Sequence, residues 1–278
     1  MANSHAMLIT LLHIVVKLAA LTPQTIQIEP GTLMKIWVPK ETVTTNNAGK
    51  TIYTPPTKPA VLLLHSFGTD AMTNWSPQVN VLTQDYSVYV PDFLFFGGSF
   101  TNRKERSVSF QAEFVAKGLK KLKVEKVTLV GLSYGGIVGA FIAHNDRGVK
   151  RLTSVVTHKP QPAPNSVSQN FLETMFSNRK ERNELLEALV VPDEDANWDF
   201  NYSQVIKILT SAMTYNIYVV GDDDKLFDLD LARFMKAKLG EKTKLDWIKD
   251  AGHLVQSEQS AEYNKRLKRF LQHVTQYQ

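Results

Sequence analysis

The 278-residue chain contains no cysteine. This absence excludes a disulfide framework, thiolate metal sites and a cysteine nucleophile, and it favours a reducing compartment. A strong charge of one sign is also missing, because 32 basic residues stand against 27 acidic ones and leave a net charge of +5. With 43% hydrophobic and 21% charged residues, the composition is that of a globular protein. A chain of this length buries a substantial core, so we expect one large domain.

The positive charge does not gather into a surface for nucleic acids. The pentapeptide Asn-Arg-Lys-Glu-Arg occurs at residues 102–106 and again at residues 178–182, each time before a segment of periodic apolar residues. Both copies contain a glutamate, so we interpret them as solvated first turns of helices. A nucleic-acid site would need a basic stripe interleaved with stacking aromatic residues, and the sequence has none. We therefore expect no nucleic-acid partner.

A hydrophobic run long enough to span a membrane is absent too. Residues 7–21 are apolar but are interrupted by three polar residues and are too short for a transmembrane helix. They lack a basic leading region, although Ala19 and Ala20 keep a signal peptide open as an alternative. Residues 1–5 resemble the remnant of an expression vector. We expect residues 1–24 to hold this remnant and an amphipathic helix that packs on the body or rests on a membrane, in a cytoplasmic protein.

The most informative stretch surrounds Ser133. An apolar β-branched run at residues 127–130 predicts a strand, and the apolar segment at residues 137–143 predicts a helix. Between them lies a sharp turn in which Gly131 and Gly135 flank the serine. Small neighbours allow a strained backbone that pushes a hydroxyl outward, so this stretch predicts a nucleophile elbow.

An acid and a histidine follow the serine in the chain. Three adjacent carboxylates, Asp222, Asp223 and Asp224, come after an apolar strand, and one of them should face the histidine. His253 lies after the alternating segment 243–248 and before a terminal helix. In such a set the imidazole moves the serine proton, and the buried carboxylate holds the ring and stabilises its cation. Neighbouring carboxylates cannot all turn toward one ion, so we expect no metal there. A serine, an acid and a histidine need no cofactor, and we expect none.

A fourth segment supplies hydrogen-bond donors for an anionic intermediate. The apolar strand at residues 62–64 ends in His65 and a loop of small residues. We expect the backbone N–H groups of Phe67 and Tyr134 to form an oxyanion hole, because Tyr134 directly follows the serine and Phe67 lies in the loop where this architecture places the second donor. We interpret His65 as a brace for that loop.

With these four segments in this order, the chain resembles the α/β-hydrolase superfamily, and in finer detail it is similar to plant hydrolases called monoacylglycerol-lipase-like or carboxylesterase-like. The resemblance implies a mostly parallel sheet flanked by helices, with a core at residues 25–160 and 212–278. It also implies a helical lid at residues 161–211, inserted before the strand that carries the acid. The family's Gly-acid-x-Asp pattern selects Asp224 as the acid, and Asp222 and Asp223 remain alternatives.

The alternation of strands and helices along the chain agrees with an α/β fold. We expect a hairpin at residues 25–38 and a helix at residues 110–122. Continuously apolar segments, typical of strands buried on both faces, predict parallel strands at residues 60–64, 87–90, 127–130, 152–156 and 216–220.

These observations predict a serine hydrolase that cleaves an ester with a lipid-like or aromatic acyl part through an acyl-enzyme on Ser133. Phe93 and Phe96 either line an apolar acyl pocket or pack in the core. Ser66 stands where the family has glycine, and the segment 157–164 shortens the expected lid. These departures motivate two alternatives, which are a lyase, cyclase or transferase that uses the same residues, and a ligand receptor without turnover.

Overall fold

The computed structural model describes most of the predicted core. The described residues are 20–136, 138, 149–158, 180, 181, 184, 185, 216–224, 227, 229–239, 241 and 243–275. The predicted N-terminal helix up to residue 19 lies outside them, as does the predicted lid apart from residues 180, 181, 184 and 185. Within the described ranges, every helix is too short or too polar to cross a bilayer.

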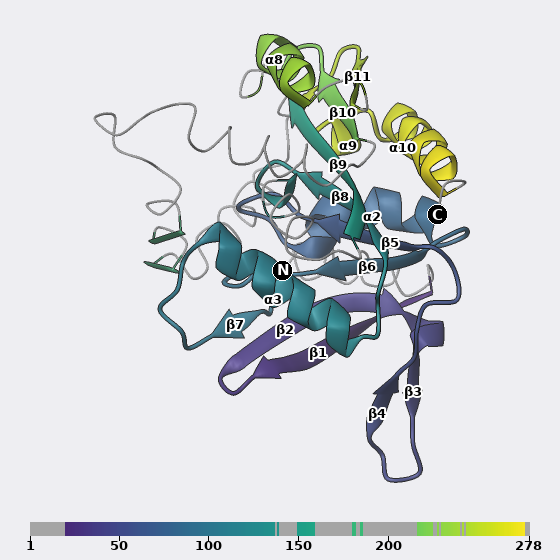
Figure 1. Ribbon diagram of the computed structural model, residues 1–278, viewed down its shortest axis with the longest axis vertical. Helices are drawn as coiled ribbons and strands as arrows, with labels where there is room; N and C mark the ends of the chain where they lie inside the picture. Colours follow the sequence, from purple (N-terminus) through teal and green to yellow (C-terminus); the bar gives the residue numbers. More distant parts are fainter. Residues whose placement is uncertain are drawn as a thin grey trace, which may run out of the picture.

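A single large sheet organises the molecule (Figure 1). Its main path has the order β1-β2-β6-β5-β8-β9-β10-β11. Along this path, β6, β5, β8, β9, β10 and β11 pair in parallel, whereas β1 and β2 are antiparallel to their neighbours. The strands are β1 (Leu21–Glu29), β2 (Thr32–Pro39), β5 (Ala60–Leu64), β6 (Ser87–Pro91), β8 (Val127–Leu132), β9 (Val149–His158), β10 (Asn216–Gly221) and β11 (Thr243–Ile248). The predicted mostly parallel α/β-hydrolase sheet is confirmed.

Short strands complete the sheet and add a hairpin. Strand β7 (Phe100–Thr101) pairs with β2, and β12 (Gly252–His253) pairs with β9. Strands β3 (Val43–Thr45) and β4 (Thr51–Tyr53) form a separate two-stranded sheet. The pairing of β12 with β9 fixes the backbone at His253 to the carboxyl end of the sheet, where parallel α/β sheets bind ligands.

Helices cover both faces of the sheet (Figure 1). Successive residues of β5 point to opposite faces, as in any strand. Leu62 therefore packs in the cluster that holds Phe114 of α3, whereas Leu63 packs in the cluster that holds Trp75 of α2 and Leu267 of α10. The helices are α2 (Ala71–Leu82), α3 (Val108–Lys121), α8 (Leu229–Leu239), α9 (Val255–Glu258) and α10 (Ser260–Thr275), with a 3₁₀ turn at Lys40–Thr42.

The N-terminal hairpin begins earlier than the sequence predicted. Strand β1 starts at Leu21, whose side chain is buried and whose partner across the hairpin is Pro39. Residues 21–24 therefore belong to the core sheet and not to the N-terminal segment. This part of the strand contains Pro23, which is tolerated because β1 is an edge strand, where a missing N–H donor breaks no pairing on the outer side.

Candidate active site

The backbone at Ser133 has the strain that the sequence predicted for an elbow. Ser133 follows the last residue of β8 and has φ of 52°, in the left-handed region that side chains other than glycine rarely adopt. The chain then turns into helical residues 134–136. A Cβ added at Gly135 would collide with the backbone carbonyl groups of Leu64 and His65 at the end of β5. The glycine thus lets the elbow approach the neighbouring strand.

The structure brings Ser133, His253 and Asp224 together. The Nε2 atom of His253 lies 3.4 Å from Ser133 Oγ, and its Nδ1 atom lies 3.2 Å from Asp224 Oδ2 and 3.3 Å from Oδ1. The Asp224 side chain is fully buried, while the His253 side chain keeps 18% of its surface exposed. With Nδ1–H donating to the carboxylate, Nε2 is left as an acceptor facing the serine hydroxyl.

The loop at residues 222–224, here called the acid loop, places the Asp224 carboxylate next to His253. Asp224 points into the interior, where its Oδ1 also accepts a hydrogen bond of 3.0 Å from the Phe227 N–H. Asp222 is exposed, and its Oδ1 instead accepts from the Ala251 N–H at 3.4 Å. The Asp223 N–H donates to the Ala251 carbonyl at 3.0 Å. These bonds join the acid loop to the loop that carries the histidine.

The predicted oxyanion donors lie beside the elbow. Tyr134 is the first helical residue after Ser133, so its N–H has no acceptor within the helix. The Phe67 ring packs edge-on against the Tyr134 ring, with centroids 5.7 Å apart. In the same loop, the Ser66 N–H donates to Asn74 Oδ1 at 2.7 Å, and the Ser66 hydroxyl lies 3.2 Å from the hydroxyl of Thr69. The hydroxyl that departs from the family pattern is therefore held within the loop.

His65 has the geometry of a brace. Its side chain is completely buried; Nε2 accepts a 2.9 Å hydrogen bond from the Phe93 N–H, and Nδ1 lies 2.8 Å from the Ser66 carbonyl oxygen. Because a carbonyl oxygen only accepts, the Nδ1 atom carries the proton. Its two ring nitrogens thus join the loop at residues 65–69, here called the oxyanion loop, to the residues that follow β6.

The structure places Phe93 and Phe96 in the core. Both side chains have no exposed surface, and their ring centroids lie 4.6 Å and 5.4 Å from that of His65. Phe93 also contacts the Tyr134 ring edge-on, at 5.6 Å. This arrangement corresponds to the packing alternative. A role of either ring in lining an acyl pocket stays a prediction.

Comparison with protein families gives the same architecture. The family model described as the alpha/beta hydrolase fold matches residues 59–201, which is half of the chain. The chain belongs to the α/β-hydrolase family. The predicted superfamily is therefore confirmed.

Curated relatives match this α/β-hydrolase over a short part of its length. An uncharacterised protein of Mycobacterium tuberculosis is 38% identical over 86 residues, which cover 31% of this chain and 25% of that protein. Pyrrolizixenacetamide deacetylase of Xenorhabdus hominickii is 33% identical over 85 residues, which cover 31% of this chain and 32% of the enzyme. The chain therefore matches only about a quarter to a third of these relatives' own length.

Solved structures match the α/β-hydrolase over nearly its whole length. A bacterial membrane phospholipase A superposes with a TM-score of 0.78 at 19% sequence identity, covering 99% of this chain and 93% of the phospholipase. A carboxylesterase from Bacillus subtilis superposes with a TM-score of 0.68 at 14% identity, covering 94% of this chain and 96% of the esterase. At these identities the likeness establishes the fold alone.

Gly135 offers a direct test of how tightly the elbow of this α/β-hydrolase packs. In Gly135→Ala, the new methyl group would meet two backbone carbonyl groups that cannot move aside as a side chain could. We expect a loss of about 1–3 kcal/mol in the free energy of unfolding, the usual cost of overpacking, measured by urea denaturation. Serine labelling by a fluorophosphonate probe should fall as well. A variant that keeps wild-type stability and labelling would contradict this packing.

Asp92 is a second buried carboxylate near the site, and it serves the scaffold. Its Oδ1 accepts from the Ala71 N–H at the start of α2 at 2.8 Å, and its Oδ2 accepts from the Gly98 N–H at 3.2 Å. Lys35 Nζ lies 3.8 Å away. Burial, and to a lesser degree the neighbouring charge of Asp70, raise the pKa of Asp92 from 3.8 to about 6.

Because the pKa of Asp92 is raised, the stability of the folded protein should fall as the pH rises. The folded protein holds the Asp92 proton more tightly than the unfolded chain, so the contribution of this proton to stability is complete below pH 3.8 and is lost as the pH rises through 6. The difference in pKa corresponds to about 3 kcal/mol. We expect the free energy of unfolding of wild type, relative to Asp92→Asn, to fall by about this amount between pH 3 and pH 7 in urea titrations. A difference that stays constant or grows with pH would refute this assignment.

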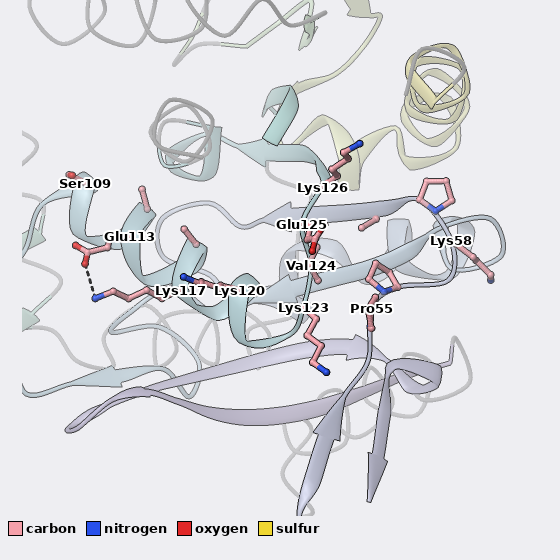
Figure 2. Close-up of a pocket in the computed structure, with 15 residues that line it drawn as sticks. Pro55, Lys58, Ser109, Glu113, Lys117, Lys120, Lys123, Val124, Glu125 and Lys126 are labelled. Atoms are coloured by element: carbon pink, nitrogen blue, oxygen red, sulfur yellow. Dashed lines mark ion pairs between the residues drawn. The ribbon is translucent and has the colours of Figure 1, made fainter. Parts of the chain in front are cut away.

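The described part of the α/β-hydrolase also has an open groove of about 1330 Å³ on its opposite side (Figure 2). The groove lies at the amino ends of β5 and β8, because its lining includes Ala60 and Lys126. Its lining is rich in lysine, but Lys117 pairs with Glu113 at 2.7 Å and with Glu29 at 3.0 Å. Within the described ranges, no three histidine, aspartate or glutamate side chains lie close enough to share a metal ion.

Proposed function

We propose that the protein is a serine hydrolase that cleaves a carboxylic ester through an acyl-enzyme on Ser133. The observation that carries the proposal is the order of contacts from the buried Asp224 carboxylate, through both nitrogens of His253, to the Ser133 hydroxyl. A serine hydroxyl is a weak nucleophile until a neighbouring base removes its proton. The contact at 3.4 Å is long for a hydrogen bond, but such contacts are often loose until substrate binds.

In the first half of the reaction, Ser133 Oγ attacks the ester carbonyl carbon while His253 Nε2 takes the hydroxyl proton. The carbonyl oxygen becomes an oxyanion that accepts hydrogen bonds from the N–H groups of Tyr134 and Phe67. The imidazolium, stabilised by Asp224, then gives its proton to the departing alkoxide. The C–O bond to the leaving alcohol breaks and the acyl group stays on the serine.

In the second half, His253 removes a proton from a water molecule, and the resulting hydroxide attacks the acyl carbon. The same two N–H groups hold the second oxyanion. Ser133 leaves with the proton returned by His253, and the product is a carboxylic acid. Every proton is thus moved by one imidazole, which explains why its tautomer must be fixed by a buried carboxylate.

The substrate that we propose is an ester with a lipid-like or aromatic acyl part. Two of the solved structures with this fold are a phospholipase A and a carboxylesterase, and these likenesses support an ester as the substrate. The name of the deacetylase relative points to a second bond class, since deacetylation of an acetamide breaks an amide. Cleavage of an ester and cleavage of an amide would form the same acyl-enzyme. The two reactions differ in the leaving group, which is an alcohol for the ester and an amine for the amide.

Labelling with a fluorophosphonate probe tests the proposal. We expect the probe to react with the purified protein and peptide mass spectrometry to find the adduct on Ser133. Nitrophenyl esters from acetyl to palmitoyl, with the matching anilides, would then report the acyl length and the bond class. An adduct on another residue, or ester turnover without any acyl-enzyme on Ser133, would overturn the proposal and favour the lyase or transferase alternative.

A further inference from the structure

Helix α2 carries two buried amide side chains on one face. Asn74 and Gln78 are 2% and 0% exposed, and they are four residues apart, which places them one above the other on a helix. A buried amide must form hydrogen bonds to offset the loss of water. Asn74 finds its partners in the loop before α2, whereas Gln78 finds its partners in α9 and α10, which follow His253.

Asn74 binds the oxyanion loop. Its Oδ1 atom accepts a hydrogen bond of 2.7 Å from the Ser66 N–H and another of 3.2 Å from the Thr69 hydroxyl. Ser66 directly precedes Phe67, whose N–H we propose as an oxyanion donor. The first turn of α2 is itself fixed, because the Asp70 carboxylate caps it by accepting from the N–H groups of Met72 and Thr73.

Gln78 binds the segment that follows the histidine. Its Nε2 atom donates to the backbone carbonyl of Gln256 at 2.8 Å and to Asn264 Oδ1 at 3.0 Å. Gln256 is completely buried in α9, which begins two residues after His253. Since α9 is a single turn of four residues, its carbonyl groups have few partners within the helix, and the bond from Gln78 fixes its position.

We propose that Gln78 is a positioning residue that sets His253 relative to the oxyanion loop through α2. The inference rests on the proposed function. Four residues of a helix span about 6 Å, so the two amides hold the loop at Ser66 and the short helix α9 at a separation that α2 sets. Gln78 touches neither substrate nor the reacting atoms. It acts by keeping the imidazole where it reaches both Ser133 and the leaving group.

Two substitutions of Gln78 test this role. Gln78→Met keeps the length of the side chain and removes both hydrogen bonds, whereas Gln78→Asn keeps the amide but is one methylene too short to reach the Gln256 carbonyl. In both variants we expect kcat for a nitrophenyl ester to fall by about tenfold, because a shift of a fraction of an ångström at a reacting group has effects of this size. KM should stay within about twofold, since no contact with bound substrate is lost.

Val79→Ala is the matched control. Val79 is the next residue on α2 and is fully buried in the core, and its apolar side chain cannot form a hydrogen bond to either segment. We expect this variant to lose stability, measured as Tm, while its kcat stays within about twofold of wild type, since it removes only core packing. Comparing the kcat of the Gln78 variants with that of Val79→Ala separates a positioning role from a general loss of stability. If Gln78→Met does not fold, the comparison is made with Gln78→Asn.

The outcomes distinguish this inference from the function on which it rests. A wild-type protein that neither reacts with the fluorophosphonate probe nor turns over esters would overturn both. A wild type labelled on Ser133, together with Gln78 variants whose kcat equals that of Val79→Ala, would overturn only the positioning role. A fall in kcat confined to the Gln78 variants, at unchanged KM, supports it.

Discussion

Replacing Ser133 with alanine is expected to lower ester turnover by about four orders of magnitude or more, the effect seen when a triad nucleophile is removed. The variant loses the atom that we propose carries the acyl group, so neither half of the reaction can proceed by the proposed route. What remains should come from the oxyanion donors and substrate binding alone. The measurement is kcat/KM for the best nitrophenyl ester in the panel.

The fold of Ser133→Ala should be unaffected or slightly more stable. Ser133 has φ of 52°, and alanine meets the same backbone strain, while the hydroxyl contributes only its 3.4 Å contact to His253. Circular dichroism and Tm therefore serve as the control. An alanine variant that keeps ester turnover above about one per cent of wild type would show that another residue attacks the substrate.

Asp224→Asn is expected to lower kcat/KM by about three to four orders of magnitude with little change in shape. The asparagine amide can donate to Nδ1 of His253 from the position of the carboxylate oxygen at 3.2 Å. That hydrogen bond favours the tautomer with the proton on Nε2, and such an imidazole cannot accept the proton of Ser133. Asparagine also removes the negative charge that stabilises the imidazolium.

Asp222→Asn and Asp223→Asn are the matched controls for this substitution. The three carboxylates are adjacent in sequence; the structure places the Asp224 carboxylate against the His253 ring, whereas that of Asp222 accepts from the Ala251 N–H. We expect both control variants to keep kcat/KM within a few-fold of wild type. A large loss in either control, with Asp224→Asn nearly unaffected, would move the role of the acid to a neighbour.

Much of the core was predictable because its signals are local. The strand at residues 60–64 was predicted with the bounds that β5 has, because a continuous apolar run reflects burial directly, and the alternating segment noted at residues 243–248 coincides with β11. The start of β1 was missed by four residues, and its Pro23 is tolerated because β1 lies at the edge of the sheet, which only the assembled structure shows.

The buried amides that hold the segments of the candidate site had no local pattern in the sequence that could predict their role. Asn74 and Gln78 look like ordinary polar positions of a helix, and their partners Ser66 and Gln256 lie 8 and 178 residues away in sequence. Likewise, a phenylalanine in the sequence does not show whether its ring lines a pocket or packs in the core, and this holds for Phe93 and Phe96. Their complete burial against His65 is a property of the assembled structure.

The sequence by itself determined the α/β architecture, the elbow at Ser133 and the order of serine, acid and histidine, because backbone preference and periodic burial act over a few neighbouring residues. The family pattern had already favoured Asp224, but the burial of its carboxylate, its contact with His253 and the hydrogen bonds of Asn74 and Gln78 were decided by tertiary structure. Ser133 and His253 are 120 residues apart, and they meet because the strands that precede them end at the same edge of one parallel sheet. That distance depends on every strand pairing between them, which no local pattern encodes.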